Sequence, residues 1–251
     1  SPPQDPAYAL FTSGSTGKPK GVVVSNGALG NYLAHCADTY FSAEQPGTVH
    51  VFTPLAFDFT LTEVLGGLLA GCEVIFHSEE TSPYDSVKRS LEDEACRVLK
   101  LTPSHIQLAD EKWFQEATAK TLVVGGEPLQ PAHVDTCLAQ TEHRLINEYG
   151  PTEAAVGCVT HRINRHETPL IGQPIAGVGV AVIDEHTKLV PRGVAGELCL
   201  MGKSLASGYL NDTGQTERAF TRLNEIPEEI AYRTGDLVRM QNDGRLALAL
   251  T

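Results

Sequence analysis

The chain has 251 residues, enough for one or two domains with a sizeable hydrophobic core. Hydrophobic residues make up 41% of the chain and charged residues 20%, a composition that is typical of globular proteins and excludes disordered or collagen-like chains. The 19 basic and 31 acidic residues give a net charge of −12, so we expect neither nucleic acid nor an anionic membrane surface as a partner.

The spacing of cysteines and histidines argues against a metal site built from these residues. The six cysteines contain no C-x-x-C pair, and His161 and His166, the closest pair of histidines, do not have the i, i+4 spacing of ligands on a helix. We favour reduced thiols in a cytoplasmic protein. The most apolar stretch, residues 61–76, contains Glu63 and Glu73 and is shorter than the roughly 20 residues that a membrane-spanning helix needs.

Strand-like and helix-like segments alternate through the first two thirds of the chain. Short apolar runs rich in β-branched residues predict strands at 7–12, 21–24, 49–53, 73–76, 98–101, 121–124 and 144–146. Ser25 is a candidate N-cap for a helix that runs to about Tyr40, and Ser82 and Pro83 start a helix that carries Val87, Leu91 and Cys96 on one face. This alternation predicts βαβ units, that is, an α/β fold with a parallel sheet layer and flanking helices.

The sequence pattern changes near residue 171, where glycines and prolines interrupt short strand-like runs. Strands are predicted at 178–183 and 197–201, and a hairpin is predicted from 236–240 and 245–250 around the turn at 241–244. We therefore expect two parts: an α/β part at 1–170, and a smaller β-rich, distorted barrel-like subdomain at 171–251.

The segment from Thr12 to Gly21 combines the features that polyphosphate binding requires. Its glycines allow backbone N–H groups to converge on oxygens, its hydroxyls add donors, and Lys18 and Lys20 supply positive charge. It is not a Walker loop, because Pro19 follows Lys18 where Ser or Thr is required. A solvated flexible loop is the alternative, but two lysines and a predicted strand on each side favour phosphate binding.

Five motifs in order give this chain a family resemblance. The sequence AYALFTSGSTGKPKG at 7–21 resembles the phosphate-loop motif of the adenylate-forming superfamily, in particular the amino-acid adenylation domains of nonribosomal peptide synthetases. It is followed by FDFT at 57–60, NEYGPTE at 147–153, GELCLMGKSLASGYL at 196–210 and YRTGD at 232–236. The resemblance implies part of the adenylate-forming enzyme fold and the use of ATP and Mg²⁺ to activate an amino acid as its aminoacyl adenylate. It also implies carrier and condensation domains as partners.

The resemblance also implies roles for individual residues in nucleotide binding. The residues expected to hold the ATP phosphates are Thr12, Ser13, Gly14, Ser15, Thr16, Gly17 and Lys20. Thr152 is expected to contact phosphate and Glu153 to hold Mg²⁺, and with Lys20 they form the expected catalytic set. The residues expected around the nucleoside are Tyr149, which stacks on adenine, Asp236, which accepts both ribose hydroxyls, and Gly126 and Asn147, which line the adenine pocket.

The same resemblance implies an amino-acid pocket. A buried ammonium group needs a carboxylate partner, and Asp58 occupies that family position. The pocket residues implied by the resemblance are Asp58, Phe59, Thr62, Arg97, Val123, Gly125, Glu148, Val156 and Gly157. Two arrangements are expected for Arg97. It pairs with Glu148, and the pair presents a neutral polar wall to a carboxamide, or it binds a side-chain carboxylate of the substrate directly. Asparagine, followed by aspartate, is the expected substrate, and an exposed surface position for Arg97 is the alternative.

The chain also departs from the family pattern. An N-terminal layer and a C-terminal lid with its catalytic lysine, both implied by the resemblance, lie outside residues 1–251, so we expect weak nucleotide binding by the chain alone. An acyl-CoA ligase-like enzyme acting on a carboxylic acid without an amino group is one alternative function. A non-catalytic nucleotide-binding relic is the other.

Overall fold

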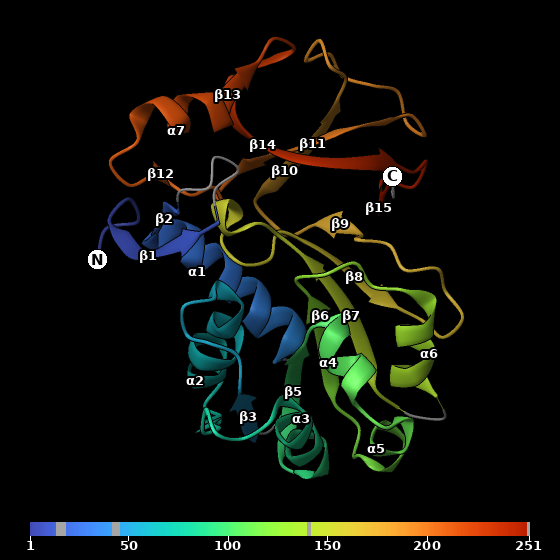
Figure 1. The fold of residues 1–251 in the computed structure, drawn as a ribbon. Coiled ribbons are helices and arrows are strands. Elements are labelled where there is room, and N and C mark those ends of the chain that lie inside the picture. The colour runs from blue at the N-terminus through green and yellow to red at the C-terminus, as the bar shows by residue number, and fades with distance from the viewer. Residues whose placement is uncertain (14–18, 42–45, 140–141, 250–251) are drawn as a thin grey trace. The chain divides into compact units, whose positions relative to one another are not determined.

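The structure is a computed structural model and describes residues 1–13, 19–41, 46–139 and 142–249 (Figure 1). The chain forms two compact units. The first comprises Ser1–Tyr32, Gly150–Thr160 and Leu170–Thr251, and the second comprises Leu33–Tyr149 and His161–Pro169. This division is discontinuous in sequence and differs from the consecutive boundary near residue 170 that we expected.

A parallel sheet lies at the centre of the second unit. Its strands run in the order β4-β3-β5-β6-β7, and each neighbouring pair is parallel. Their bounds are β3 (Thr48–Val51), β4 (Glu73–Phe76), β5 (Cys96–Leu101), β6 (Thr121–Gly125) and β7 (Arg144–Tyr149). The strand β8 (Val159–Ile163) is divided between the two units. The predicted βαβ arrangement is confirmed for this part of the chain.

Four helices cover one face of this sheet, as Figure 1 shows. They are α3 (Pro83–Glu92), α4 (Pro103–Leu108), α5 (Glu111–Glu116) and α6 (Pro131–Leu138). Ser82 caps α3 by accepting a hydrogen bond from the Asp85 backbone N–H at 3.1 Å. Val87 and Leu91 of α3 enter the core as predicted, whereas Cys96 reaches the same core from the first residue of β5, because α3 ends at Glu92.

Short irregular helices pack against the other face of the same sheet. They are the π-helices η1 (Cys36–Tyr40) and η3 (Thr62–Gly66), the 3₁₀ helix η2 (Asp58–Thr60) and the one-turn helix α2 (Gly67–Leu69). Side chains alternate between the faces of a strand, so Leu122 and Val124 enter the helix-covered core while Val123 and Gly125 face the other way. The polar residues of the candidate site lie on this second face.

The first unit contains antiparallel sheets, and one of them corrects a prediction. The strands β1 (Pro6–Thr12) and β2 (Lys20–Ser25) pair antiparallel with each other, and β12 (Gly208–Tyr209) pairs antiparallel with β2. We had grouped the first two strands with the parallel sheet. The connection between them is too short for a parallel crossover, which needs a dozen or more residues.

The second sheet of the first unit runs in the order β10-β11-β14-β13, with β15 paired to β14. Its strands are β10 (Val178–Ile183), β11 (Ala195–Gly202), β13 (Phe220–Leu223), β14 (Ile226–Met240) and β15 (Leu246–Leu248). The hairpin predicted around 241–244 is therefore present. The described strands form no closed barrel, in contrast to the barrel-like shape we expected, because β10 and β13 lie at the two open ends of the sheet order.

The remaining elements of the first unit are short, apart from one longer helix. They are α1 (Asn26–His35), which continues into the second unit, η4 (Thr152–Ala154), β9 (Gln173–Pro174) and α7 (Thr213–Ala219). The predicted cap is present, since the Ser25 hydroxyl accepts a hydrogen bond from the Ala28 backbone N–H at 3.2 Å. The α-helical part ends at His35, and the π-helix η1 continues to Tyr40. Within the described ranges, every helix is too short or too polar to cross a membrane.

Candidate functional site

The predicted phosphate loop connects β1 and β2. The ends of these strands are in register, with Thr12 opposite Lys20. Thr12 is half-buried and Ser13 is exposed. The other predicted loop residues, Gly14, Ser15, Thr16 and Gly17, lie outside the described residues.

Lys20 belongs to a buried polar cluster with Glu153 and Tyr209. The Tyr209 hydroxyl donates a hydrogen bond to Oε1 of Glu153 at 2.7 Å, and Nζ of Lys20 lies 4.0 Å from the same oxygen. Nζ of Lys20 also donates to the Tyr209 hydroxyl at 3.5 Å and lies 4.8 Å from the centre of its ring. The cluster thus brings a hard carboxylate oxygen and a cation together, as phosphate and a divalent cation would require.

A second tyrosine adjoins this carboxylate. Tyr232, on β14, is buried, and the charge of Glu153 and the Tyr209 hydroxyl act on it. Burial, followed by the neighbouring Glu153 charge, raises the pKa of Tyr232, and burial and the hydrogen bond to Glu153 raise the pKa of Tyr209. Both tyrosines therefore keep their protons at neutral pH, and the Tyr209 hydroxyl remains a donor to Glu153.

Thr152 and Glu153 lie in a tightly folded segment. They form the 3₁₀ turn η4, and Ala155 and Val156 follow it with positive φ angles of 51° and 70°. A β-branched residue rarely adopts this conformation, so Val156 is strained. The backbone carbonyl of Glu153 accepts a hydrogen bond from the Ala206 N–H at 2.8 Å, which fixes the segment. Gly157, the other predicted pocket residue here, follows Val156 directly.

Asp236 lies at an exposed irregularity of β14, where the register against β11 shifts and Glu197 of β11 holds the backbone in place. Glu197 accepts hydrogen bonds from the Arg233 guanidinium at 2.5 Å and 3.1 Å and from the Gly235 backbone N–H at 3.2 Å. The pKa of Arg233 is raised by the hydrogen bond to Glu197. The two motifs that contain Glu197 and Asp236 therefore contact each other, and Asp236 itself is exposed.

In the second unit, Glu148 is the centre of a buried polar cluster. Its Oε1 forms an ion pair with Nζ of Lys100 at 2.6 Å, and its Oε2 accepts a hydrogen bond from the Tyr40 hydroxyl at 2.7 Å. Nζ of Lys100 also donates to Oγ1 of Thr62 at 2.6 Å and lies 4.3 Å from the ring centre of Phe59. Three predicted pocket residues, Phe59, Thr62 and Glu148, are thus brought together around a lysine that the sequence analysis did not single out.

The expected pairing of Arg97 with Glu148 is wrong. Strand register places Val98 beside Thr121 and Gly125 beside Glu148. Arg97 therefore lies roughly 13 Å or more from the level of Glu148, towards the amino ends of the strands. A Cβ atom on Gly47 would meet Cγ of Arg97 at 2.7 Å, which locates the half-buried Arg97 beside that residue. The cation of this wall is Lys100, three residues further along β5.

The other predicted pocket residues lie near the carboxyl end of β6. Val123 is buried on the same face of the sheet as Lys100, to which it is registered. A Cβ atom on Gly125 would lie 2.5 Å from the backbone oxygen of Glu148, so only glycine fits beside this strand. Gly126, at a φ of 81°, lies next to Phe57 and Phe59, whose rings stack with centres 5.3 Å apart.

Asp58, Asn147 and Tyr149 complete the predicted set in this unit. Asp58 is the first residue of η2 and is buried, although it is ionisable. Asn147 is buried near the carboxyl end of β7, and Tyr149 is the half-buried last residue of that strand. Parallel strands place ligands at their carboxyl ends, so these positions agree with a binding role.

Glu63, next to Thr62 on η3, is a second acid in this region. Its side chain is buried, and in the described part of the chain its Oε2 has no hydrogen-bond partner. Burial raises the pKa of Glu63 from 4.5 to about 8, while the Lys100 charge acts in the opposite direction. Glu63 is therefore mainly a neutral carboxylic acid at pH 7.

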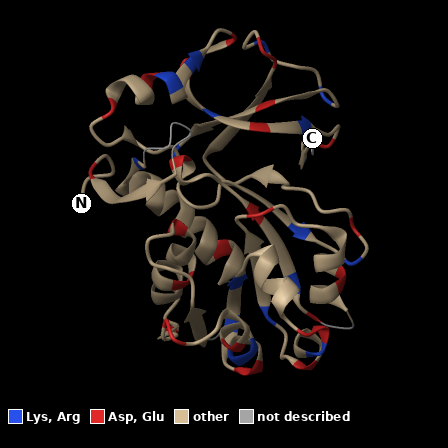
Figure 2. Ribbon diagram, in the orientation of Figure 1, with Lys and Arg blue, Asp and Glu red and all other residues tan. Residues whose placement is uncertain are grey.

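The residues present suit a magnesium ion that is bound together with substrate phosphates better than one that is held by protein ligands alone. Within the described residues, no group of three His, Cys, Asp or Glu side chains could hold a metal ion. Mg²⁺ is commonly held by one or two carboxylates together with substrate phosphates. Glu153 offers such a carboxylate, and Lys20 beside it offers positive charge to the phosphates. Basic residues are otherwise interspersed with acidic ones along the ribbon (Figure 2).

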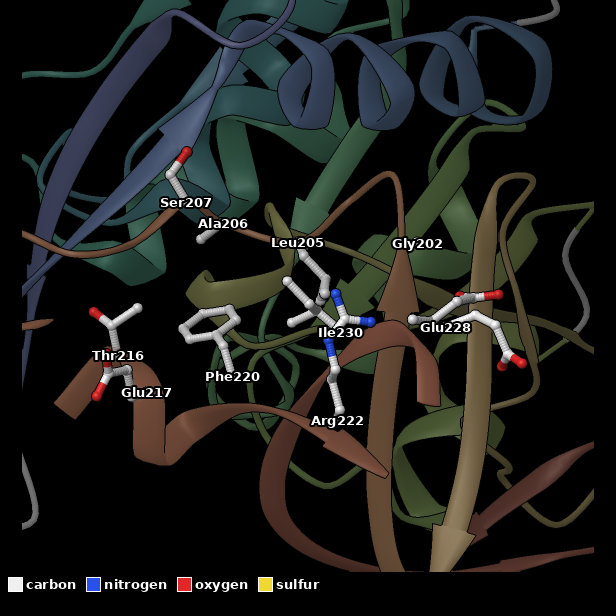
Figure 3. A pocket seen from close by; sticks show the side chains of 11 residues that line it. Gly202, Leu205, Ala206, Ser207, Thr216, Glu217, Phe220, Arg222, Glu228 and Ile230 are labelled. Carbon is white, nitrogen blue, oxygen red and sulfur yellow. The ribbon is translucent and has the colours of Figure 1, made fainter. Parts of the chain in front are cut away.

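A cavity of about 520 Å³ in the first unit is separate from these residues. It lies between α7, β13, β14 and the segment from Gly202 to Ser207. Figure 3 shows the side chains that line it, among them Leu205, Phe220 and Ile230. The predicted site residues that the structure describes do not line this cavity, so it takes no part in the assignments above.

The family comparison agrees with this geometry. The AMP-binding enzyme family matches residues 1–210, and the chain belongs to that family. Bacitracin synthase 3 of Bacillus licheniformis is 36% identical over 248 residues, which cover 96% of this chain and 4% of that protein. Surfactin synthase subunit 2 of Bacillus subtilis (strain 168) is 36% identical over 254 residues, which cover 96% of this chain and 7% of that protein. The chain thus spans less than a tenth of the length of these relatives.

Solved structures show the same similarity. The four-domain nonribosomal peptide synthetase AB3403, bound to AMP and glycine, has a TM-score of 0.86 and 31% identity over 97% of this chain and 18% of its own. The Vibrio cholerae adenylation domain AlmE, in complex with glycyl-adenosine-5'-phosphate, has a TM-score of 0.85 and 29% identity over 99% of this chain and 48% of its own. The resemblance to adenylation domains of nonribosomal peptide synthetases and the predicted α/β fold are therefore confirmed.

Proposed function

We propose that this chain activates an amino acid with ATP, forming an aminoacyl adenylate and releasing pyrophosphate. The observation that carries the proposal is the buried Asp58 on η2, in the same unit as the buried Lys100–Glu148 pair. A buried carboxylate can pair with a cation, and the α-ammonium group of an amino acid is such a cation. The relatives whose structures hold glycine with AMP, or glycyl adenylate, support the same conclusion.

In the proposed reaction the chain acts by positioning and by neutralising charge. The substrate carboxylate attacks the α-phosphorus, and the bond from that phosphorus to the bridging oxygen breaks as pyrophosphate leaves. Lys20 and Thr152 would contact the phosphates, and Glu153, held by Tyr209, would be the residue that holds Mg²⁺. The bound magnesium ion adds positive charge to the polyphosphate.

The nucleoside part of ATP is assigned to four residues. Asp236 follows Gly235, whose backbone N–H is held by Glu197. It accepts hydrogen bonds from the two ribose hydroxyls, because an ionised carboxylate has two acceptor oxygens. Tyr149 stacks on adenine, and Asn147 and Gly126 line the adenine pocket. The main-chain and hydroxyl donors of Thr12 and Ser13, with the loop residues that follow them, complete the phosphate contacts.

We further propose a polar substrate side chain, with asparagine first and aspartate second. Lys100 and Glu148 neutralise each other and present both a donor and an acceptor group, which is the pattern that a carboxamide complements. This replaces the wall that we had assigned to Arg97. Phe59, Val123 and Gly125 of the second unit belong to the proposed pocket. Val156 and Gly157 of the first unit keep the substrate-binding role that the family resemblance implies for them.

The proposed partners follow from the relatives. A carrier domain would accept the activated amino acid, and a condensation domain would use it, in a cytoplasmic synthetase. The solved protein PA1221, which contains adenylation and PCP domains, is 29% identical to this chain, and the match covers 99% of this chain and 51% of PA1221.

The proposal is tested by comparing asparagine with succinamic acid, which has the same carboxylate and carboxamide but no α-amino group. ATP–pyrophosphate exchange is measured with both acids, on the chain and on any longer native polypeptide that carries it. We expect exchange with asparagine only, and a loss in Asp58→Ala equivalent to roughly 3–5 kcal/mol, as for a stranded buried charge. Equal exchange with succinamic acid would instead support the acyl-CoA ligase alternative.

A further inference from the structure

Tyr40 contacts the proposed amino-acid pocket from outside the predicted pocket residues. It is the last residue of the π-helix η1, and its side chain is fully buried. Its hydroxyl donates to Oε2 of Glu148 at 2.7 Å, the oxygen opposite the one that pairs with Lys100. Each carboxylate oxygen of Glu148 thus has its own donor.

The direction of this hydrogen bond is fixed by chemistry. An ionised carboxylate only accepts hydrogen bonds, so Tyr40 must be the donor. Burial and the neighbouring Glu148 charge raise the pKa of Tyr40 well above its ordinary value, so the hydroxyl keeps its proton. Tyr40 therefore stabilises Glu148 as an anion, and the Lys100 pair depends on that charge.

The ring of Tyr40 is itself held in place. The His35 ring meets it edge-on, with centres 5.2 Å apart at an angle of 86°. Nδ1 of His35 lies 3.4 Å from the hydroxyl of Thr39, and Arg144 of β7 donates a hydrogen bond to the Thr39 carbonyl. The π-helix is thereby anchored to the strand that carries Glu148, so the position of Tyr40 relative to that carboxylate is set by backbone as well as side-chain contacts.

We propose that Tyr40 is a positioning residue for substrate selection: it orients Glu148 so that the Lys100–Glu148 pair forms the polar wall of the amino-acid pocket. This inference rests on the proposed function. Loss of the hydroxyl removes a donor that fixes one oxygen of Glu148, and the carboxylate can then turn away from its present orientation. This change misplaces the acceptor that distinguishes a polar side chain from an apolar one.

The test uses Tyr40→Phe, which removes one hydroxyl and keeps the ring. Exchange kinetics are measured with asparagine, aspartate and alanine in the polypeptide that shows amino-acid-dependent exchange. We expect kcat/KM for the preferred polar amino acid to fall roughly 10- to 100-fold relative to alanine, the range for a hydrogen bond to a charged group, mainly through KM. KM for ATP stays unchanged.

Two further variants separate positioning from general damage. Tyr84→Phe is the matched control, because Tyr84 is exposed and packs on Trp113, and it leaves the selectivity unchanged. In a Glu148→Ala background Tyr40→Phe has no further effect on the polar-to-alanine ratio, since Tyr40 acts through Glu148. An unchanged ratio in Tyr40→Phe overturns the inference alone, whereas a wild-type protein that exchanges with no amino acid overturns the proposed function and the inference with it.

Discussion

The hydroxyl of Tyr209 donates a hydrogen bond to Oε1 of Glu153, although 56 positions separate the two residues in sequence. Tyr209 belongs to the strand β12 that pairs with β2, and Lys20 is the first residue of β2. This short antiparallel pairing places Tyr209 near Lys20, and the hydrogen bond from the Ala206 N–H to the Glu153 carbonyl holds Glu153 next to them. The geometry explains how a motif near residue 210 can contribute to the proposed phosphate site at β1 and β2.

Tyr209→Phe tests the role of this hydrogen bond. Without the hydroxyl, Glu153 loses a donor that fixes its orientation, and we expect the apparent affinity for magnesium–ATP to fall by roughly tenfold, as for a hydrogen bond to a charged group of about 1.5 kcal/mol. KM for ATP is measured at saturating amino acid, with Tyr84→Phe as the control. A KM for ATP equal to that of the wild type would remove Tyr209 from the site.

The Lys100–Glu148 pair predicts a non-additive effect on stability. Lys100→Met leaves a buried Glu148 carboxylate without its cation, and we expect the free energy of unfolding to fall by about 3–5 kcal/mol. Adding Glu148→Gln to Lys100→Met removes that charge, and we expect most of the lost free energy of unfolding to be regained. Urea denaturation of the wild type, both single variants and the double variant measures the coupling, and additive losses would contradict a direct pair.

Glu63 predicts a specific dependence of stability on pH. The folded state holds the Glu63 proton up to about pH 8, whereas the unfolded state releases it near pH 4.5, so the folded state binds more protons in this window. Stability therefore falls as pH rises from about 4.5 to 8 because of this residue. Glu63→Gln removes the titration, and between pH 6 and pH 8 we expect it to gain up to about 2–3 kcal/mol relative to the wild type.

The measurement is denaturant unfolding of both proteins at pH 5.5, 6, 7 and 8. The difference between the two proteins must grow with pH over this range. A constant difference would show that Glu63 is ionised throughout, with a partner that lowers its pKa.

Gly125 predicts a steric effect beside Glu148. In Gly125→Ala the added Cβ would lie 2.5 Å from the Glu148 backbone oxygen, and we expect a loss of about 1–3 kcal/mol in unfolding free energy, as for overpacked sites. Gly30→Ala is the matched control, because nothing lies within 4 Å of its added Cβ in α1, and it should stabilise the chain by roughly 0.5–1 kcal/mol. Equal effects of the two substitutions would contradict the close approach of β6 and β7.

Local sequence signals identified most of the elements but not their long-range contacts. The strands at 73–76 and 178–183 have the predicted bounds, because apolar β-branched runs ended by turn residues are local features. The antiparallel pairing of β1 with β2 was missed, although its short connection was a signal against a parallel crossover.

The candidate site divides in the same way. Asp58 and Glu148 were found through motifs, whereas the cation beside Glu148 was placed three residues too early, at Arg97. A lysine within the apolar run Val98–Leu101 was the available signal, since a charge inside a buried strand needs a partner. The contacts of Tyr40 and Tyr209 depend on packing between distant segments, and no local pattern predicts them.

The central claim is amino-acid activation, and ATP–pyrophosphate exchange across the twenty standard amino acids tests it most directly. The assay uses the chain alone and any longer native polypeptide that carries it. We predict exchange with asparagine or aspartate well above that with alanine, and loss of this exchange in Asp58→Ala. Exchange with no amino acid in either form would contradict the claim and favour a non-catalytic nucleotide-binding module.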